Sequence, residues 1–292
     1  MQICERRFLV KKIISIIVLL YAASSFAYPI PKAFPPFKIA DNLYYVGTDD
    51  LASYLIVTPN GNILLNSNLE VNVSMLKESI ERLGFKYSDT KILLISHAHL
   101  DHAEGSKLII EQTHAKYMIM DKDVTLIQSG GVSDFQYAED SDMHFPPVKV
   151  NKVLHDGDRV TLGGVTLVAH LTAGHTPGCT SWSMTVRDKG KQKHVVIVGS
   201  LNVNPGYQLV DNKKYPEIAD DYRHAIATLT SLPCDIFLGA HAGYFNLQKK
   251  YGMLAQSEAN PFIDPKGYKQ HIAIKKQEFE QEYSHQSDMK SV

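Results

Sequence analysis

The sequence predicts an α/β fold in which two β-sheets pack together and helices cover their outer faces. Strand-like and helix-like segments alternate along the chain, and they do so in two similar halves, at about residues 40–125 and 150–245. No linker-like stretch separates these halves, so we expect one domain. Hydrophobic residues make up 44% of the chain and charged residues 21%, which is typical of a globular protein with a substantial core.

The first half opens with strand-like runs at residues 43–46, 53–58 and 62–65, the last two joined by a Pro59-Asn60-Gly61 turn. Apolar residues at helical spacing predict a helix over 71–83. The nearly continuous apolar run at 91–96 predicts a strand buried on both faces. A helix at 103–112 and a strand at 117–120 complete this half.

The second half follows a segment, 128–149, that has neither the helical nor the strand period. We expect it to be a long surface loop, and loops of that length are usually functional or mobile. The remaining periodic segments predict strands at 165–172, 182–186, 194–198 and 235–238, and helices at 218–232 and 269–283.

The N-terminal 27 residues have the pattern of a secretory signal peptide. Basic residues precede a short apolar stretch at 13–23, and Ser25 and Ala27 place small side chains at the −3 and −1 positions of a cleavage site. The apolar stretch is too short to span a bilayer of about 30 Å. We therefore expect cleavage near Ala27, export to the periplasm without stable membrane association, and a single catalytic domain at 28–292.

Charge and cysteine content narrow the class of protein further. The net charge of −1 does not indicate a nucleic-acid-binding protein, which needs a strongly basic face. Two cysteines, Cys179 and Cys234, follow the signal peptide, and export permits either a disulfide between them or two thiols. A monomer is the default expectation.

The segment His97-Ala98-His99-Leu100-Asp101-His102 concentrates metal ligands directly after the predicted buried strand. Alternate side chains of an extended segment point the same way, so the imidazoles of His97 and His99 can reach one ion. Asp101 and His102 follow as the chain turns into a helix. Packing does not explain three histidines and an aspartate in six residues, because buried carboxylates need partners.

Two further histidines, His175 and His241, lie in glycine-containing turns that follow predicted strands. With the first motif they complete two sites of three protein ligands each, and catalytic zinc keeps three protein ligands and an open position. His170 lies in a predicted strand, and His224 in a predicted helix is a weaker candidate. The histidines in polar surroundings are expected to be solvated: His114, His144, His155, His194, His271 and His285.

The motif of residues 97–102, the Gly174-His175-Thr176 turn and the late His241 resemble the metallo-β-lactamase superfamily. The resemblance implies a four-layer αββα sandwich with two mixed sheets. Ser200 stands where most hydrolases of the superfamily carry a metal-bridging aspartate and where subclasses B1 and B2 carry cysteine, so the sequence is similar to subclass B3. Asn66 departs from the aspartate of many members.

This resemblance implies two zinc ions per chain, the first bound by His97, His99 and His175 and the second by Asp101, His102 and His241. It also implies a substrate pocket lined by Ser200, Asn202, Asn204 and Tyr207. Ser200 and Asn202 would hold the substrate carboxylate, and Asn204 and Tyr207 would lie near the lactam carbonyl. A plain Asn-Pro-Gly turn is the alternative interpretation of residues 202–207.

The activity implied is hydrolysis of the amide bond of β-lactam antibiotics (penicillins, cephalosporins and carbapenems) by a metal-bound hydroxide that Asp101 orients, which would confer antibiotic resistance. Two alternatives stay open: another hydrolase of the superfamily, such as a lactonase or thioesterase, and an exported protein that binds zinc without catalysis.

Overall fold

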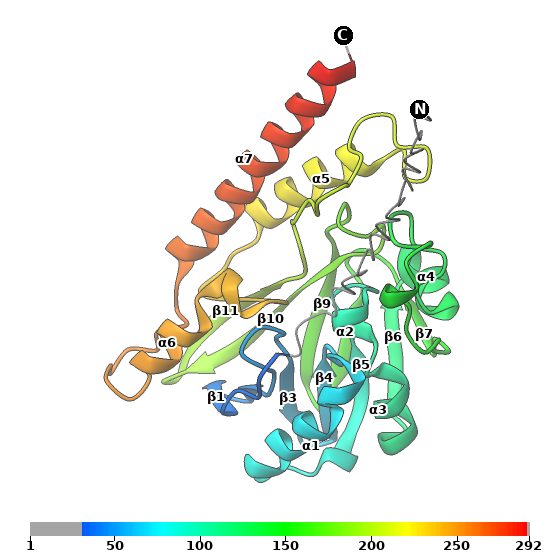
Figure 1. Cartoon of the computed structure of the whole chain (residues 1–292). Coiled ribbons are helices and arrows are strands. Elements are labelled where there is room, and N and C mark those ends of the chain that lie inside the picture. Colours follow the sequence, from blue (N-terminus) through cyan, green and yellow to red (C-terminus); the bar gives the residue numbers. More distant parts are fainter. Residues whose placement is uncertain (1–30, 291–292) are drawn as a thin grey trace, which may run out of the picture. The chain divides into compact units, whose positions relative to one another are not determined.

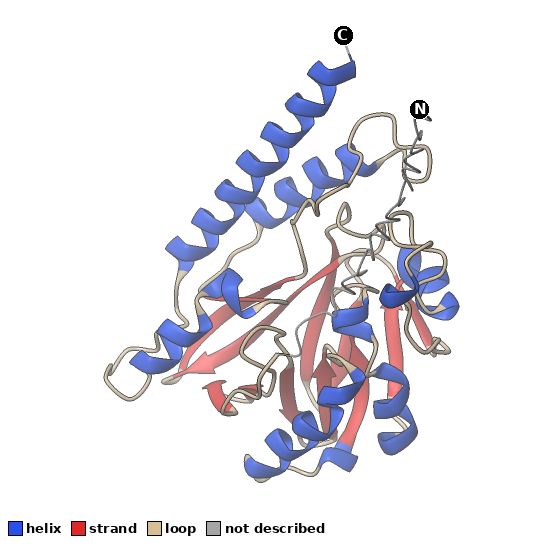
Figure 2. Cartoon of the chain, viewed as in Figure 1, coloured by secondary structure: helices blue, strands red, loops and turns tan. Residues whose placement is uncertain are grey.

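Two mixed β-sheets form the centre of the computed structural model, which describes residues 31–290 (Figures 1 and 2). The predicted signal peptide lies outside these residues. The first sheet is ordered β1 to β7: β1 (Phe37–Ala40), β2 (Leu43–Tyr45), β3 (Tyr54–Thr58), β4 (Gly61–Leu65), β5 (Thr90–Leu94), β6 (Lys116–Met120) and β7 (Lys152–Leu154). The second is ordered β12-β11-β10-β9-β8: β8 (Arg159–Leu162), β9 (Val165–Leu171), β10 (Thr180–Asp188), β11 (Lys191–Val198) and β12 (Ile236–Gly239).

Helices lie outside the sheets. The first half supplies α1 (Val73–Arg82), α2 (Leu100–Ala103), α3 (Ser106–Thr113) and α4 (Val124–Ser129), and the second supplies α5 (Ile218–Ser231), α6 (Leu247–Met253) and α7 (Pro265–Lys290). Figure 1 shows α7 running alongside α5. The predicted αββα sandwich with two mixed sheets is confirmed.

The apolar run at 91–96 forms β5 because both faces of the strand are buried. Ile92 and Leu94 belong to the core shared with the second sheet, whereas Leu93 and Ile95 pack in the other core cluster, against residues such as Leu76 of α1. The strand has parallel partners on both sides, β4 and β6. A continuous apolar sequence is what such a central parallel strand requires.

Several short elements were absent from the sequence prediction, namely β1, β7, β8, α4 and α6. They have three to seven residues, too few to show a clear period. The terminal helix is also longer than predicted and runs from Pro265 to Lys290.

The expectation of a surface loop at 128–149 is wrong in part. Its first residues belong to α4, and its side chains Phe135, Phe145 and Val148 are buried in the two cores. The segment is therefore an irregular stretch that packs against the sheets and fixes the positions of its polar side chains.

Cys179 and Cys234 are both free thiols. Between residues 31 and 290, none of the helices combines the length and the apolarity needed to cross a bilayer.

Candidate metal centre

The first motif lies at the carboxyl end of β5. The backbone stays extended to His99, and α2 begins at Leu100, so Asp101 and His102 occupy its first turn. The Asn66 side chain holds the start of this segment, because its Oδ1 accepts from Ser96 N at 2.8 Å and its Nδ2 donates to Ala52 O at 3.2 Å. An aspartate could not make the second bond, since it has no N–H to donate.

Two turns of the second half of the chain bring the other histidines to this place. His175 lies between β9 and β10, and His241 follows β12. Gly174 is required before His175: its φ is +130°, and a Cβ there would lie 2.7 Å from the ring of Tyr222. This close approach lets the turn lie against α5.

The structure brings all six predicted metal ligands together. The donor atoms of His97, His99 and His175 lie within 4.8 Å of one another, with His99 Nδ1 3.1 Å from His175 Nε2. The donor atoms of His97, Asp101 and His102 satisfy the same limit.

His241 joins the second group from the turn that follows β12. Its Nε2 lies 3.2 Å from His102 Nε2 and 3.4 Å from Asp101 Oδ2, and the last two atoms are 3.3 Å apart. A tetrahedral zinc with Zn–N distances of about 2.0–2.1 Å has neighbouring donors about 3.3 Å apart. The donor spacing and the nitrogen-rich donor set therefore fit zinc in both groups.

Most of the imidazoles are oriented by a partner on the ring nitrogen that faces away from the cluster. Such a partner fixes the ring and its tautomer, so that the other nitrogen offers a lone pair to a metal. The hydrogen-bonded pairs are His97 Nδ1 with Ser96 Oγ (3.1 Å), His175 Nδ1 with Asn202 O (2.9 Å) and His241 Nδ1 with Asp50 Oδ1 (3.4 Å). His99 Nε2 lies 3.4 Å from Asp134 Oδ2, an ion-pair contact without hydrogen-bond geometry.

Burial keeps most of these imidazoles neutral. It lowers the pKa of His97 and His102, and the pKa of His175 to about 3. The neighbouring rings lower the pKa of His97 further, whereas Asp101 raises that of His102 and offsets part of the effect of burial. Burial acts to lower the pKa of His241 too, but Asp50 and Asp101 outweigh it and raise that pKa. Neutral imidazole is the form that binds metal.

Asp101 is the carboxylate of the cluster. Its burial acts to raise the pKa of the carboxyl, but the facing rings of His102 and His241 outweigh burial and hold the pKa well below its usual range. The side chain is therefore an anion, able to bind a cation or to accept a hydrogen bond.

The predicted pocket residues lie beside the cluster in a segment that follows β11. Ser200 Oγ is 3.3 Å from Tyr244 Oη, Asn202 Nδ2 donates to the same Tyr244 oxygen at 2.9 Å, and Asn204 Nδ2 donates to Tyr137 Oη at 3.0 Å. Tyr207 is buried, and its hydroxyl donates to His175 O at 2.9 Å. Tyr207 thus holds the His175 turn, and its contact with substrate stays a prediction.

The alternative interpretation of residues 202–207 accounts for part of this segment, since Pro205 and Gly206 form a turn with a φ of +87° at the glycine. The backbone carbonyl of Asn202 has a further task. It accepts from Tyr222 Oη at 2.6 Å as well as from the His175 ring, so it connects the segment to α5.

Sequence reasoning missed the residues that support the ligands. Asp134 and Tyr137 lie in the irregular stretch 130–149, whose length was their one signal, and Tyr244 follows His241 by three positions. His271 was expected to be solvated, and this is wrong: its ring lies between Phe237 and Tyr244, at centroid distances of 5.3 and 4.9 Å. Helix α7 places it there, a contact that no local pattern shows.

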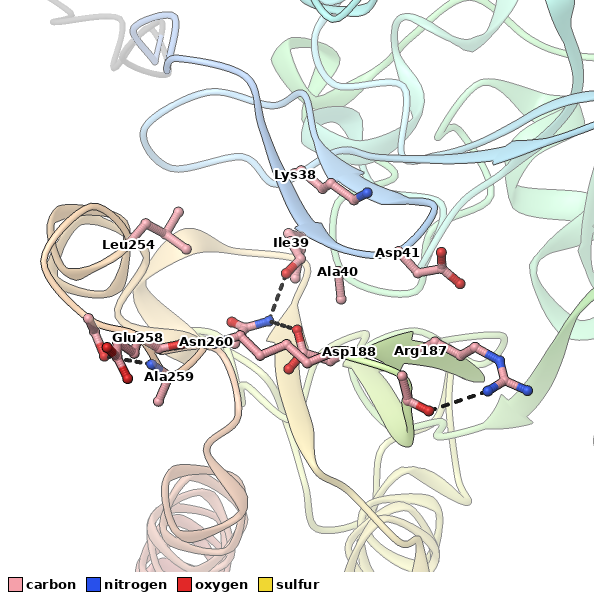
Figure 3. Close-up of a pocket in the computed structure, with 13 residues that line it drawn as sticks. Lys38, Ile39, Ala40, Asp41, Arg187, Asp188, Leu254, Glu258, Ala259 and Asn260 are labelled. Carbon is pink, nitrogen blue, oxygen red and sulfur yellow. Dashed lines mark hydrogen bonds between the residues drawn. The ribbon is translucent and has the colours of Figure 1, made fainter.

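A separate surface pocket of about 630 Å³ opens between β1, the β10–β11 hairpin and residues 254–260 (Figure 3). Asn260 Nδ2 donates there to Ile39 O at 2.8 Å and to Asp188 Oδ1 at 3.1 Å. None of the six predicted metal ligands lines this pocket, so it is not part of the metal centre.

Comparison with known proteins shows one family and one fold. The sequence matches the profile of the metallo-beta-lactamase superfamily over residues 47–241. The native FEZ-1 metallo-β-lactamase of Legionella gormanii is 63% identical, with a TM-score of 0.88, and the match covers 89% of this chain and 99% of that one.

Two more distant structures are named as subclass B3 enzymes. BJP-1 of Bradyrhizobium japonicum is 37% identical with a TM-score of 0.83, over 89% of this chain and 97% of its own. LRA-12, a di-zinc enzyme from an Alaskan soil metagenome, is 34% identical with a TM-score of 0.80, over 86% of this chain and 94% of its own.

Proposed function

Because the chain belongs to the metallo-β-lactamase superfamily, we propose that it is a zinc-dependent β-lactamase of subclass B3. It would hydrolyse the amide bond of penicillins, cephalosporins and carbapenems and so confer antibiotic resistance. The observation that carries the proposal is the donor set: five imidazoles and one carboxylate in two facing groups, with Ser200 beside them in place of a bridging carboxylate or a thiolate.

Two zinc ions would occupy this centre. His97, His99 and His175 would hold the first, and Asp101, His102 and His241 the second. When bound, zinc lowers the pKa of coordinated water towards neutrality and polarises the carbonyl oxygen of the substrate.

The protein's own groups have three tasks in this reaction. The Asp101 carboxylate, a member of the second group of donors, accepts a hydrogen bond from the attacking water, which orients that water. Ser200 and Asn202 hold the substrate carboxylate, and Asn204 lies near the lactam carbonyl. The partners on the outer ring nitrogens keep the imidazoles in place while the substrate enters and leaves.

Metal removal is the first test of this function. We expect dialysis against a chelator to abolish nitrocefin hydrolysis and added zinc to restore it. A panel of a penicillin, a cephalosporin and a carbapenem, set against a homoserine lactone and a thioester, distinguishes a β-lactamase from other hydrolases of the superfamily. Turnover of the lactone or thioester alone would contradict the proposal, and so would β-lactam hydrolysis that the chelator leaves unchanged.

We also propose that the protein acts in the periplasm as a monomer. The basic residues, apolar stretch and small residues of positions 1–27 support cleavage near Ala27, and periplasmic β-lactams would be its substrates.

A further inference from the structure

The ring of Tyr244 packs closely against its neighbours in the fold. It lies in a 3₁₀ turn (Ala242–Phe245) directly after His241, between the rings of His241 and His271 at centroid distances of 5.3 and 4.9 Å. A Cβ at Gly239 would lie 2.8 Å from the Tyr244 ring, so the absence of a side chain at the end of β12 makes room for it.

The hydroxyl of Tyr244 is directed at the two residues expected to hold the substrate carboxylate. Its oxygen is 2.9 Å from Asn202 Nδ2 and 3.3 Å from Ser200 Oγ. The Oδ1 atom of Asn202 is buried without a partner among the described residues, so the Asn202 amide is held through its nitrogen, by Tyr244. Ser200 Oγ also accepts from Asn202 N at 3.2 Å.

Ser200, Asn202 and Tyr244 together have two hydrogen-bond donors that are not used among themselves. The two hydroxyls and the Asn202 amide carry four hydrogens. One amide hydrogen is used on the Tyr244 oxygen, and one hydroxyl hydrogen joins Tyr244 to Ser200 in either direction. One O–H and one N–H remain, and two neighbouring donors match the two oxygens of a carboxylate.

We propose that Tyr244 is a positioning residue of the substrate-carboxylate site, which orders Ser200 and Asn202 into this pair of donors. The inference rests on the proposed β-lactamase function and deepens it. Tyr244 thereby sets the preference of the enzyme for anionic substrates. It acts on substrate binding and leaves the metal ligands unchanged.

The test compares Tyr244→Phe with the unaltered enzyme on a cephalosporin and on the methyl ester of its carboxylate. We expect the variant to raise KM for the free acid about 3- to 10-fold, the effect of losing a hydrogen bond of ordinary strength, with little change in kcat. KM for the ester should stay within twofold, about the scatter of a neutral change. Zinc content should be unchanged. Tyr251→Phe, which removes a hydroxyl from α6, is the matched control and should alter neither KM.

The proposed β-lactamase function and the role of Tyr244 can fail independently. Failure of the unaltered enzyme to hydrolyse any β-lactam would overturn the proposed function. If the unaltered enzyme is active but Tyr244→Phe changes KM for the acid and KM for the ester equally, or changes neither, only the proposed role of Tyr244 is overturned.

Asn202→Ala provides a second route that does not depend on the folding of the first variant. Added to Asn202→Ala, the Tyr244→Phe change should raise KM for the acid by less than it does in the unaltered enzyme, because Tyr244 acts partly through Asn202. Fully independent effects would contradict the proposal. If Tyr244→Phe does not fold, Asn202→Ala alone must weaken the preference for the acid over the ester, and an unchanged preference would overturn the inference.

Discussion

Single side chains around the cluster decide which nitrogen of each imidazole faces the metal. The protein uses different groups for this purpose: a serine hydroxyl for His97, a backbone carbonyl for His175 and carboxylates for His99 and His241. A carboxylate also makes the imidazole a better donor, because it stabilises the positive charge that metal binding induces in the ring. Neither His99 Nε2 nor His102 Nδ1 makes a hydrogen bond among residues 31–290, but His99 has the Asp134 carboxylate 3.4 Å away.

Asp134→Ala tests this role at the His99 ring. We expect zinc affinity to fall about 10- to 100-fold, the usual cost of losing such a partner. The measurement is residual activity as free zinc is lowered with a chelator of known affinity. Asp140→Ala, which removes an exposed carboxylate from the same stretch, is the control and should keep its zinc. Equal zinc affinity in the two variants would show that Asp134 does not support the site.

At the scale of elements, one buried carboxylate joins the two segments that carry the first group of histidines, namely the first motif and the His175 turn. Asp123, at the N-terminal end of α4, accepts from Ala98 N at 3.0 Å in the first motif. It also accepts from Thr176 Oγ1 at 2.8 Å and Gly178 N at 2.7 Å in the His175 turn. A Cβ at Gly178 would lie 2.5 Å from Asp123 N, so the glycine allows the contact.

Asp123→Asn should therefore destabilise both loops together. The amide keeps the shape of the side chain but presents an N–H group to donors that need an acceptor, at a cost of about 1–3 kcal/mol in the free energy of unfolding. Urea denaturation of the zinc-free protein measures this change in the free energy of unfolding. The exposed Asp121→Asn is the matched change two positions earlier. If both substitutions have the same effect, the three bonds do not stabilise the loops.

Helix α7 contributes to the site through α5. Its Phe279 is fully buried and stacks on Tyr222 at a centroid distance of 5.3 Å, and the Tyr222 hydroxyl donates to Asn202 O. The helix thus packs behind the residue that connects the pocket segment to the His175 turn.

Phe279→Ala should lower the free energy of unfolding by about 3–5 kcal/mol, because a large buried ring leaves a cavity. Ile274→Ala removes an exposed apolar side chain of the same helix, 45% exposed, and should change stability little. Urea denaturation of both variants gives the comparison. Comparable losses would mean that α7 is held by something other than this ring.

At the scale of the whole molecule, export is the property to test. Expression of the full chain in a Gram-negative host should give a periplasmic protein whose N-terminus, determined by mass spectrometry, is Tyr28. Recovery of uncleaved protein from the membrane fraction would contradict the proposed cleavage near Ala27.

The sequence by itself determined the strand–motif–helix order around residues 91–112 and the identity of the six donors. Both follow from local rules: β5 needs an unbroken apolar run, and metal ligands are of few residue types at short spacings. Ser200 distinguished the B3 type for the same reason, since it stands at a fixed place after a recognisable strand.

The tertiary structure alone decided which groups support those donors. Asn202 meets His175 across 27 positions, Tyr244 meets Asn202 across 42, and His241 meets His102 across 139. Such contacts depend on how the two sheets and α7 pack, and packing depends on the whole chain, so no local period predicts them. The six candidate metal ligands could be named from the sequence, whereas the positions of Asp134, Asp123 and Tyr244 beside them follow only from the tertiary structure.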